Sequence, residues 1–520
     1  MSDAQPIQSR TAGPRRRGAA LAVLTAGGLL SALAVAAPAQ AAPDAPYKAG
    51  TAKAIPGQYI VVLKAGADAS AVARGHGIQP RFVYSASIDG FAGALSKAQL
   101  ARIRKDPSVA YVSPDGVATI SGKPQPAKDG SETSRSPRAA TSGDVSTRTT
   151  QNNATWGIDR VDQRTGLNTT YNYTATGAGV RAYVIDTGIY TAHTQFGGRA
   201  GVGFDSVGDG QNGQDCHGHG THVAGTIGGA TYGLAKSVGL TAVRVLNCAG
   251  SGSFSGVIAG IDWVTYNHNG PSVANMSLGG GFSQPVNDAV TRSIAHGVTY
   301  AVAAGNEGQN ACNVSPASTP GALTVGATGN TDVRAAFSNF GPCVDVFDPG
   351  VSITSAWIGS NVATNTISGT SMAAPHVAGL SALFLQASPY ATPALVTDVI
   401  KSTAVVGIVG NPGAGSPNLF ARKWNGALTG TGNSQYQPDG TYWYQATTGY
   451  IQGWLVGTAG TDPDLYLERW SGTAWVSVAG SASLTPNERV VYLGTPAYYR
   501  LRAYAYSGAG SFDVWSNHPA

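Results

Sequence analysis

The chain has 520 residues, a net charge of +5 and 70 glycines. This length exceeds what a single hydrophobic core organises, so two or three domains are expected. The positive charge is small and forms no basic stripe with interleaved aromatic residues, so nucleic acid is not indicated as a partner. The glycine content lies above the usual share of ~7%, which indicates a loop-rich protein.

Residues 1–41 have the pattern of an export signal. Three consecutive arginines, Arg15 to Arg17, precede the apolar stretch 18–37, and Ala39-Gln40-Ala41 offers a small-residue cleavage site. An uncleaved membrane anchor is the alternative, because the stretch approaches spanning length. Its many Ala and Gly residues favour cleavage. No other segment is apolar enough to span a membrane, so we expect an exported protein without an anchor.

Residues 42–120 are expected to fold as a small α+β unit. Ile55–Lys64 has the pattern of an edge strand, and 96–115 that of an amphipathic helix followed by a strand. Residues 121–150 are polar and nearly free of large apolar side chains, which predicts a disordered linker.

The next two segments contain a candidate catalytic carboxylate, Asp186, and a candidate catalytic imidazole, His219. Val180–Ile189 is a buried-strand pattern that ends at Asp186, followed by Thr-Gly. Asp215–Gly229 holds three histidines, and glycines flank His219, which allows an exposed ring and close backbone approach. Clustered histidines can bind zinc, but the HExxH pattern is absent. We interpret His219 as a general base, His222 as a packed structural residue and His217 as a loop residue.

Two further segments contribute an amide and a hydroxyl. Val298–Gly308 is another buried-strand pattern, and it ends at Asn306, whose side chain suits donation to an oxyanion. Ser368–Gly379 leads into an apolar helical pattern, with Ser371 at the helix start. Taken alone, Ser371 is most simply a helix cap. Together with a base it becomes a candidate nucleophile, and the helix N-terminus favours negative charge there.

These segments resemble the subtilase family of serine proteases. The matching strings are VIDTGI, GHGTHVAGTIGG, ANMSLGGG, AVAAGNEG and SGTSMAAPHVAG, with Asp, His and Ser in the family's order. TWGIDRVDQR, SGVIAGIDWV and SPASTPGALTVGA narrow the resemblance to the proteinase K and aqualysin branch. The resemblance implies an α/β catalytic domain over 151–424, with a mostly parallel sheet flanked by helices. It also implies a triad of Asp186, His219 and Ser371, with Asn306 as oxyanion donor.

Glycine-rich segments suit the capture of an extended peptide by strand pairing. In the resembling family two such segments bind the substrate backbone, and small residues wall the pocket for the residue before the cut. The residues implied are Gly250, Ser251, Gly252, Ser277, Leu278, Gly279, Gly280, Ala303, Ala304 and Gly305. Small walls predict a roomy apolar pocket and broad cleavage with a preference for large apolar or aromatic residues.

Four cysteines in an exported chain indicate two disulfides, and the residues alone leave three pairings open. The resemblance implies Cys216–Cys248 and Cys312–Cys343. A zinc site that combines cysteine with His217 is the disfavoured alternative.

The resemblance also implies structural calcium, which needs carboxylate and carbonyl oxygens. One implied site uses the Asp345 carboxylate with the carbonyls of Pro320 and Ala322. A second implied site uses Asp159, Asp162 and Gln163, although Asn168 and Thr170 depart from the acidic or amide ligands expected there.

The α+β unit at 42–120 resembles the inhibitory propeptide of subtilases. This implies a folding aid and inhibitor that the enzyme removes itself. The linker at 121–150 is longer than the family's usual connector, so the maturation cut is expected either near Ile120 or near Thr149.

The composition changes after Trp424. Residues 425–437 are rich in glycine and predict a linker, and 438–517 alternate with many aromatics, which predicts an all-β sandwich. This region resembles the C-terminal pre-peptidase modules of secreted bacterial proteases. The residues leave two roles open for this region, binding of a substrate surface and stabilisation of the enzyme. Asp462 and Asp464 are expected to fix a turn rather than to bind calcium.

The combined expectation is a secreted, monomeric serine endopeptidase made as a self-processed zymogen, which cleaves polypeptides. An inactive scaffold that binds a partner is disfavoured by the intact triad. A lipase or esterase of α/β-hydrolase type would need G-x-S-x-G, with Ser ahead of Asp and His, and neither is present.

Overall fold

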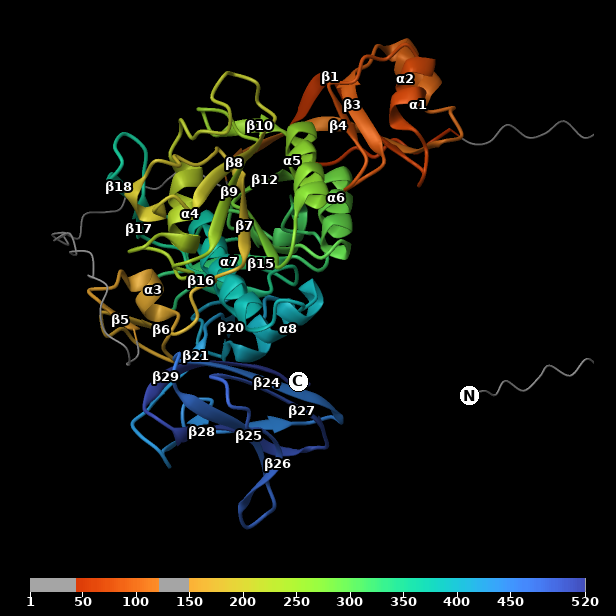
Figure 1. Cartoon of the computed structure of the whole chain (residues 1–520). Helices are drawn as coiled ribbons and strands as arrows, with labels where there is room; N and C mark the ends of the chain where they lie inside the picture. Colours follow the sequence, from red (N-terminus) through yellow and green to blue (C-terminus); the bar gives the residue numbers. More distant parts are fainter. Residues whose placement is uncertain (1–43, 121–148, 520) are drawn as a thin grey trace, which may run out of the picture. The chain divides into compact units, whose positions relative to one another are not determined.

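The computed structural model describes residues 44–120 and 149–519 (Figure 1). The expected export signal at 1–41 and most of the expected linker at 121–150 lie outside the described residues. In the described part, no helix is long and apolar enough to cross a membrane.

The first described segment is an α+β unit, as expected. Its strands are β1 (Ala54–Leu63), β2 (Phe82–Tyr84), β3 (Gly90–Ala94) and β4 (Val109–Ile120), and its helices are α1 (Ala69–Gly75) and α2 (Lys97–Ile103). The strands pair antiparallel in the order β4-β1-β3-β2. Helix α2 starts with a capping box, in which Ser96 and Gln99 satisfy each other's backbone N–H groups.

The catalytic region begins earlier than a linker over 121–150 predicts. Strand β5 (Thr149–Asn152) pairs antiparallel with β6 (Thr170–Tyr173), and α3 (Trp156–Arg160) lies between them. The end of the expected linker is therefore ordered, because polar residues there find backbone partners in β6.

A sheet with the order β19-β20-β16-β15-β13-β11-β7-β9-β8 forms the centre of this region. Its strands are β7 (Arg181–Asp186), β8 (Ala200–Asp205), β9 (Gly239–Arg244), β11 (Ser272–Met276), β13 (Thr299–Ala303), β15 (Leu323–Thr328), β16 (Val346–Pro349), β19 (Val405–Val406) and β20 (Leu419–Phe420). All pairs except β19–β20 are parallel. This confirms the expected α/β class.

Helices cover both faces of the sheet, as the unbroken apolar strands require. On one face α4 (His219–Gly228) and α7 (Thr370–Ala387) pack against β7, and α8 (Pro393–Thr403) packs against β13, in one core cluster with Ala182 and Val184 of β7. On the other face α5 (Phe254–Asn267) packs against β7 and α6 (Gln284–Ala295) against β13, in one core cluster with Tyr183 and Ile185 of β7. Figure 1 shows α5 and α6 side by side.

Further short strands lie outside this sheet. They are β10 (Ser251–Ser253), β12 (Leu278–Gly281), β14 (Val314–Ser315), β17 (Ile353–Ala356) and β18 (Thr364–Ile367). Two of them, β10 and β12, carry expected substrate residues.

The C-terminal region is all β, as expected. One sheet has the order β21-β29-β24-β27, and the other has the order β22-β28-β25-β26 with β23 beside β28. The bounds are β21 (Trp424–Leu428), β22 (Ser434–Gln437), β23 (Trp443–Gln445), β24 (Gly449–Gly457), β25 (Asp462–Trp470), β26 (Trp475–Ser481), β27 (Asn487–Gly494), β28 (Ala497–Ser507) and β29 (Gly510–Asn517).

The expectation of a linker at 425–437 is wrong. These residues contain β21 and β22, which pair with β29 and β28. Glycine and polar residues gave the segment a linker composition, but alternate side chains such as Trp424 and Leu428 are buried in the sandwich.

Candidate active site

Asp186 and His219 form a buried pair at the ends of two elements. Asp186 is the last residue of β7, and its Oδ1 accepts hydrogen bonds from the Thr187 N–H at 2.7 Å and from His219 Nδ1 at 2.8 Å. A carboxylate only accepts, so Nδ1 carries the proton and Nε2 is the basic nitrogen. His219 opens α4 directly after Gly218, whose φ of 106° suits glycine.

Asp215 holds the loop that leads into this helix. Its Oδ1 accepts from the N–H groups of His217 and Gly218 and from the Thr187 hydroxyl, and its Oδ2 accepts from the N–H and hydroxyl of Thr221. These contacts tie the residue after Asp186 to the turn before His219. Reasoning from the sequence missed Asp215, whose contact with Thr187 across 28 residues has no local signal.

The other two histidines lie where the sequence placed them. His222 is fully buried in α4 and bonds the Ile353 carbonyl through Nε2 at 2.9 Å; burial lowers its pKa to about 3. His217 lies in the loop, and burial and the neighbouring His219 lower its pKa. The alternative of a zinc site gains no support. Among the described residues, the one cluster with cysteine ligands contains Cys216 and Cys248, and these two sulfurs form a disulfide with each other.

Ser371 is the second residue of α7 and is buried. Its hydroxyl donates to the Ser277 carbonyl at 3.0 Å, while the Ser277 hydroxyl donates to the Ser371 carbonyl at 2.8 Å. Asn275 Nδ2 in turn donates to the Ser277 hydroxyl at 2.9 Å. The start of α7 is thus fastened to the segment between β11 and β12.

The Asn306 side chain is oriented by Thr370, the first residue of α7. Its Oδ1 accepts from the Thr370 N–H at 2.8 Å and from the Thr370 hydroxyl at 2.9 Å. Because Thr370 holds the amide oxygen of Asn306, the NH2 group is the end of this side chain that can donate a hydrogen bond to a developing oxyanion. The Thr370 contact has no local sequence signal beyond its position next to Ser371.

The two expected substrate edges flank a strand of the chain's own N-terminal unit. β4 pairs antiparallel with β10 on one side and with β12 on the other. Thr119 lies opposite Ser251 and Gly279, Ile120 lies opposite Leu278, and the Ile120 N–H donates to the Gly250 carbonyl at 3.0 Å. A peptide can therefore lie here as a middle strand.

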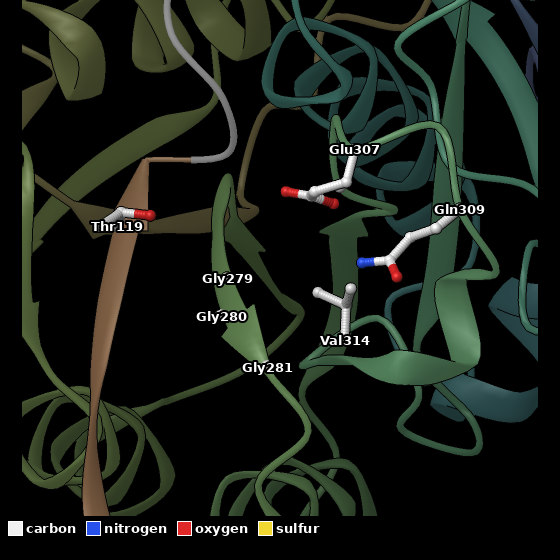
Figure 2. A pocket seen from close by; sticks show the side chains of 8 residues that line it. Thr119, Gly279, Gly280, Gly281, Glu307, Gln309 and Val314 are labelled. Atoms are coloured by element: carbon white, nitrogen blue, oxygen red, sulfur yellow. The ribbon is translucent and has the colours of Figure 1, made fainter. Parts of the chain in front are cut away.

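A pocket of about 150 Å³ opens beside this strand (Figure 2). Gly279, Gly280 and Gly305 line it as expected, whereas Ala303 and Ala304 are buried. Sequence reasoning missed Glu307 and Gln309, whose side chains face the glycine strand across the pocket. The pocket is thus less apolar than its small-residue walls predict.

Both disulfides match the pairing that the resemblance implied. Cys216–Cys248 has a Cα–Cα distance of 5.0 Å, and Cys312–Cys343 has one of 5.3 Å. The first joins the His219 loop to the segment before β10.

The expected calcium ligands divide into two cases. Asp345 has a partly buried carboxylate, whose Oδ1 pairs with Lys401 Nζ at 3.0 Å and whose Oδ2 accepts from the Thr324 N–H at 3.0 Å. A carboxylate with backbone carbonyls is the ligand chemistry that calcium prefers. Asp159 does not suit a cation, because it accepts from the N–H groups of Asn168 and Thr169 and from the Gln163 side chain. Asp162 is buried and accepts from Asn172, and burial raises its pKa to about 6.

Comparison with known proteins decides the family. Residues 177–441, about half of the chain, match the Subtilase family, Peptidase S8. The chain belongs to the subtilase family. Residues 58–121 match Peptidase inhibitor I9, so this subtilase carries an inhibitor segment over β1 to β4.

Several relatives are similar over most of their length. An "Extracellular serine proteinase" of Thermus sp. (strain Rt41A) is 48% identical over 419 residues, which cover 75% of this chain and 96% of that protein. "Alkaline serine exoprotease A" of Vibrio alginolyticus is 42% identical over 441 residues, which cover 85% and 73%. The crystal structure of a cold adapted subtilisin-like serine proteinase has a TM-score of 0.51 at 52% identity and covers 52% of this chain and 98% of that one. This subtilase is accordingly a serine peptidase.

Proposed function

We propose that this subtilase is exported and acts outside the cell as an endopeptidase, made as a zymogen that processes itself. The observation that carries the proposal is the buried Asp186–His219 pair close to a cleft in which β4 lies as a strand between β10 and β12. The extracellular relatives and the export pattern at 1–41 support the location.

In the proposed reaction Ser371 attacks the peptide carbonyl. Its hydroxyl turns from the Ser277 carbonyl to His219 Nε2, which takes the proton and later gives it to the leaving amine. Asp186 keeps the Nδ1 proton in place and stabilises the imidazolium. Catalytic hydrogen bonds often form only in the substrate complex, so the Ser277 contact suits a resting state.

Asn306 Nδ2 and the Ser371 N–H are proposed to bind the oxyanion. The Thr370 contacts orient the amide before substrate arrives, so no reorganisation is needed during the reaction.

The substrate is proposed to be an extended polypeptide, cut with broad specificity and a preference for large apolar or aromatic residues before the cleaved bond. The glycine walls of the pocket leave room for such side chains. Glu307 and Gln309 add polar groups to the pocket, which is consistent with a broad rather than a narrow preference.

Calcium is proposed as a structural ion at Asp345, with the carbonyls of Pro320 and Ala322. Lys401 contacts the same carboxylate, so the ion and the ammonium compete for it. We further propose that the enzyme acts as a monomer without a membrane anchor.

A fluorophosphonate label tests the proposed nucleophile. The mature enzyme should lose caseinolytic activity as one label enters per chain, and peptide mapping should place that label on Ser371. Labelling of another serine together with the loss of activity would refute the assignment.

A further inference from the structure

The C-terminal sandwich meets the catalytic region through a buried ion pair. Lys423 Nζ lies 2.5 Å from Asp513 Oδ1, and the two side chains are 0% and 1% exposed. The other carboxylate oxygen of Asp513, Oδ2, accepts from the N–H groups of Thr174 at 2.9 Å and Ala175 at 2.8 Å. One carboxylate of β29 thus forms an ion pair with a lysine and accepts hydrogen bonds from two backbone N–H groups, all of which belong to the catalytic region.

An aromatic contact lies in the same interface. Phe384 of α7 meets Trp454 of β24 with ring centroids 5.0 Å apart and Trp515 of β29 with centroids 6.1 Å apart. Both tryptophans are buried and belong, with Val456, to the same core cluster as the catalytic sheet. The helix that presents Ser371 at its start is therefore covered by the sandwich near its end.

The connection between the two parts is short. Phe420 is the last residue of β20 in the catalytic sheet, and β21 of the sandwich begins at Trp424. Between them, Lys423 N–H donates to the Val161 carbonyl and Arg422 pairs with Asp439 of the sandwich at 2.5 Å. An independently moving domain needs a flexible linker, and the described chain has no such linker between β20 and β21.

We infer that the sandwich is a fixed part of the active enzyme: Phe384, Lys423 and the Thr174–Ala175 backbone form a docking surface whose partner is the chain's own sandwich. Removal of the sandwich would take away the carboxylate that pairs with Lys423 and accepts from the Thr174 and Ala175 N–H groups, and it would expose the apolar ring of Phe384 to water. The two parts therefore unfold together. The inference does not depend on proteolysis, so it can fail while the proposed function stands.

Calorimetry of the mature enzyme, blocked by a covalent inhibitor against self-digestion, tests the inference. We expect one transition for both parts and a mature mass that includes β21 to β29. Asp513→Asn keeps the shape but removes the charge, and it should lower this single melting temperature by roughly 10 °C. The matched control Asp398→Asn, an exposed residue of α8, should shift it by less than about 2 °C.

Two results would overturn the inference. One is a pair of separate transitions, of which Asp513→Asn lowers only one. The other is a fully stable active enzyme whose mass ends before β21. If Asp513→Asn does not accumulate, the double variant Lys423→Met with Asp513→Asn should restore the folded protein with its single transition, because it removes both buried charges while the amide oxygen at position 513 still accepts from the Thr174 and Ala175 N–H groups. Separate transitions in that variant would also contradict the inference.

Discussion

At the scale of single residues, the site consists of groups that are each held by two or more neighbours. The Asp186 oxygen that binds His219 also accepts the Thr187 N–H, and Asn306 is held through both polar groups of Thr370. Such preorganisation is what electrostatic catalysis requires.

Asn306→Ala should reduce kcat by about 10² to 10³ with little change in KM, because the donor acts on the oxyanion and not on the bound substrate. This magnitude is the one known for the same type of donor in subtilisin, and we adopt it. Steady-state kinetics on a peptide substrate measure it, with Asn267→Ala at the exposed end of α5 as control. An unchanged kcat would remove Asn306 from the mechanism.

Two buried histidines should make the fold sensitive to acid. Burial lowers the pKa of His222 to about 3 and that of His376 to about 4, whereas unfolded histidine titrates near ~6.5. Below that value the unfolded chain takes up protons that the folded chain refuses, so the free energy of unfolding falls as the pH falls from about 6.5 towards 4. Melting temperatures in a Ser371→Ala background measure the effect, and His222→Gln should make the slope shallower. An equal slope would contradict the assigned neutral state of His222.

At the scale of elements, strand β4 of the inhibitor unit contacts the helices α5 and α6 of the catalytic region through side-chain hydrogen bonds. Asp115, which precedes the residues of β4 that pair with β10 and β12, accepts from the Ser255 N–H at 3.0 Å and from its hydroxyl at 2.6 Å, and so caps the start of α5. Tyr111 of β4 donates to Asp288 of α6 at 2.5 Å.

Asp115→Ala should weaken the inhibitor unit by about tenfold to a hundredfold, because it removes two hydrogen bonds to a charged group. The inhibition constant of separately prepared residues 44–120 against the mature enzyme measures this. Asp68→Ala is the control, since Asp68 caps α1 inside the unit through the Ala71 N–H. Equal inhibition by both variants would show that the α5 cap contributes nothing to the interface.

The same elements show what the sequence could predict. The parallel strands and the motif residues Asp186, His219, Asn306 and Ser371 carry local signals, since each stands close to the start or the end of an apolar pattern. The bonds of Asp215 to residues 217–221 are local, and only its contact with Thr187 joins distant segments. Glu307 carries no local signal, because its place across the pocket from the glycine strand arises only when segments far apart meet. Strand β5 also lacks a local signal. Its polar residues have low strand propensity, but the antiparallel pairing with β6 orders them as a strand.

At the scale of the whole molecule, calcium and the sandwich both concern stability. Chelation by EDTA should lower the melting temperature of the inhibited mature enzyme by roughly 5 to 10 °C if calcium is near saturation. Lys401→Met should enlarge this difference, because it removes the ammonium that contacts Asp345. A melting temperature that EDTA does not change would take calcium out of the account.

The intact mass of the exported protein, wild type beside Ser371→Ala, tests the central claim most directly. The account predicts a wild-type chain cut after Ile120, beyond the last paired residue of β4, and a Ser371→Ala chain that keeps the inhibitor unit joined. Identical processing of both proteins would mean that another protease matures the chain and would contradict self-processing by Ser371.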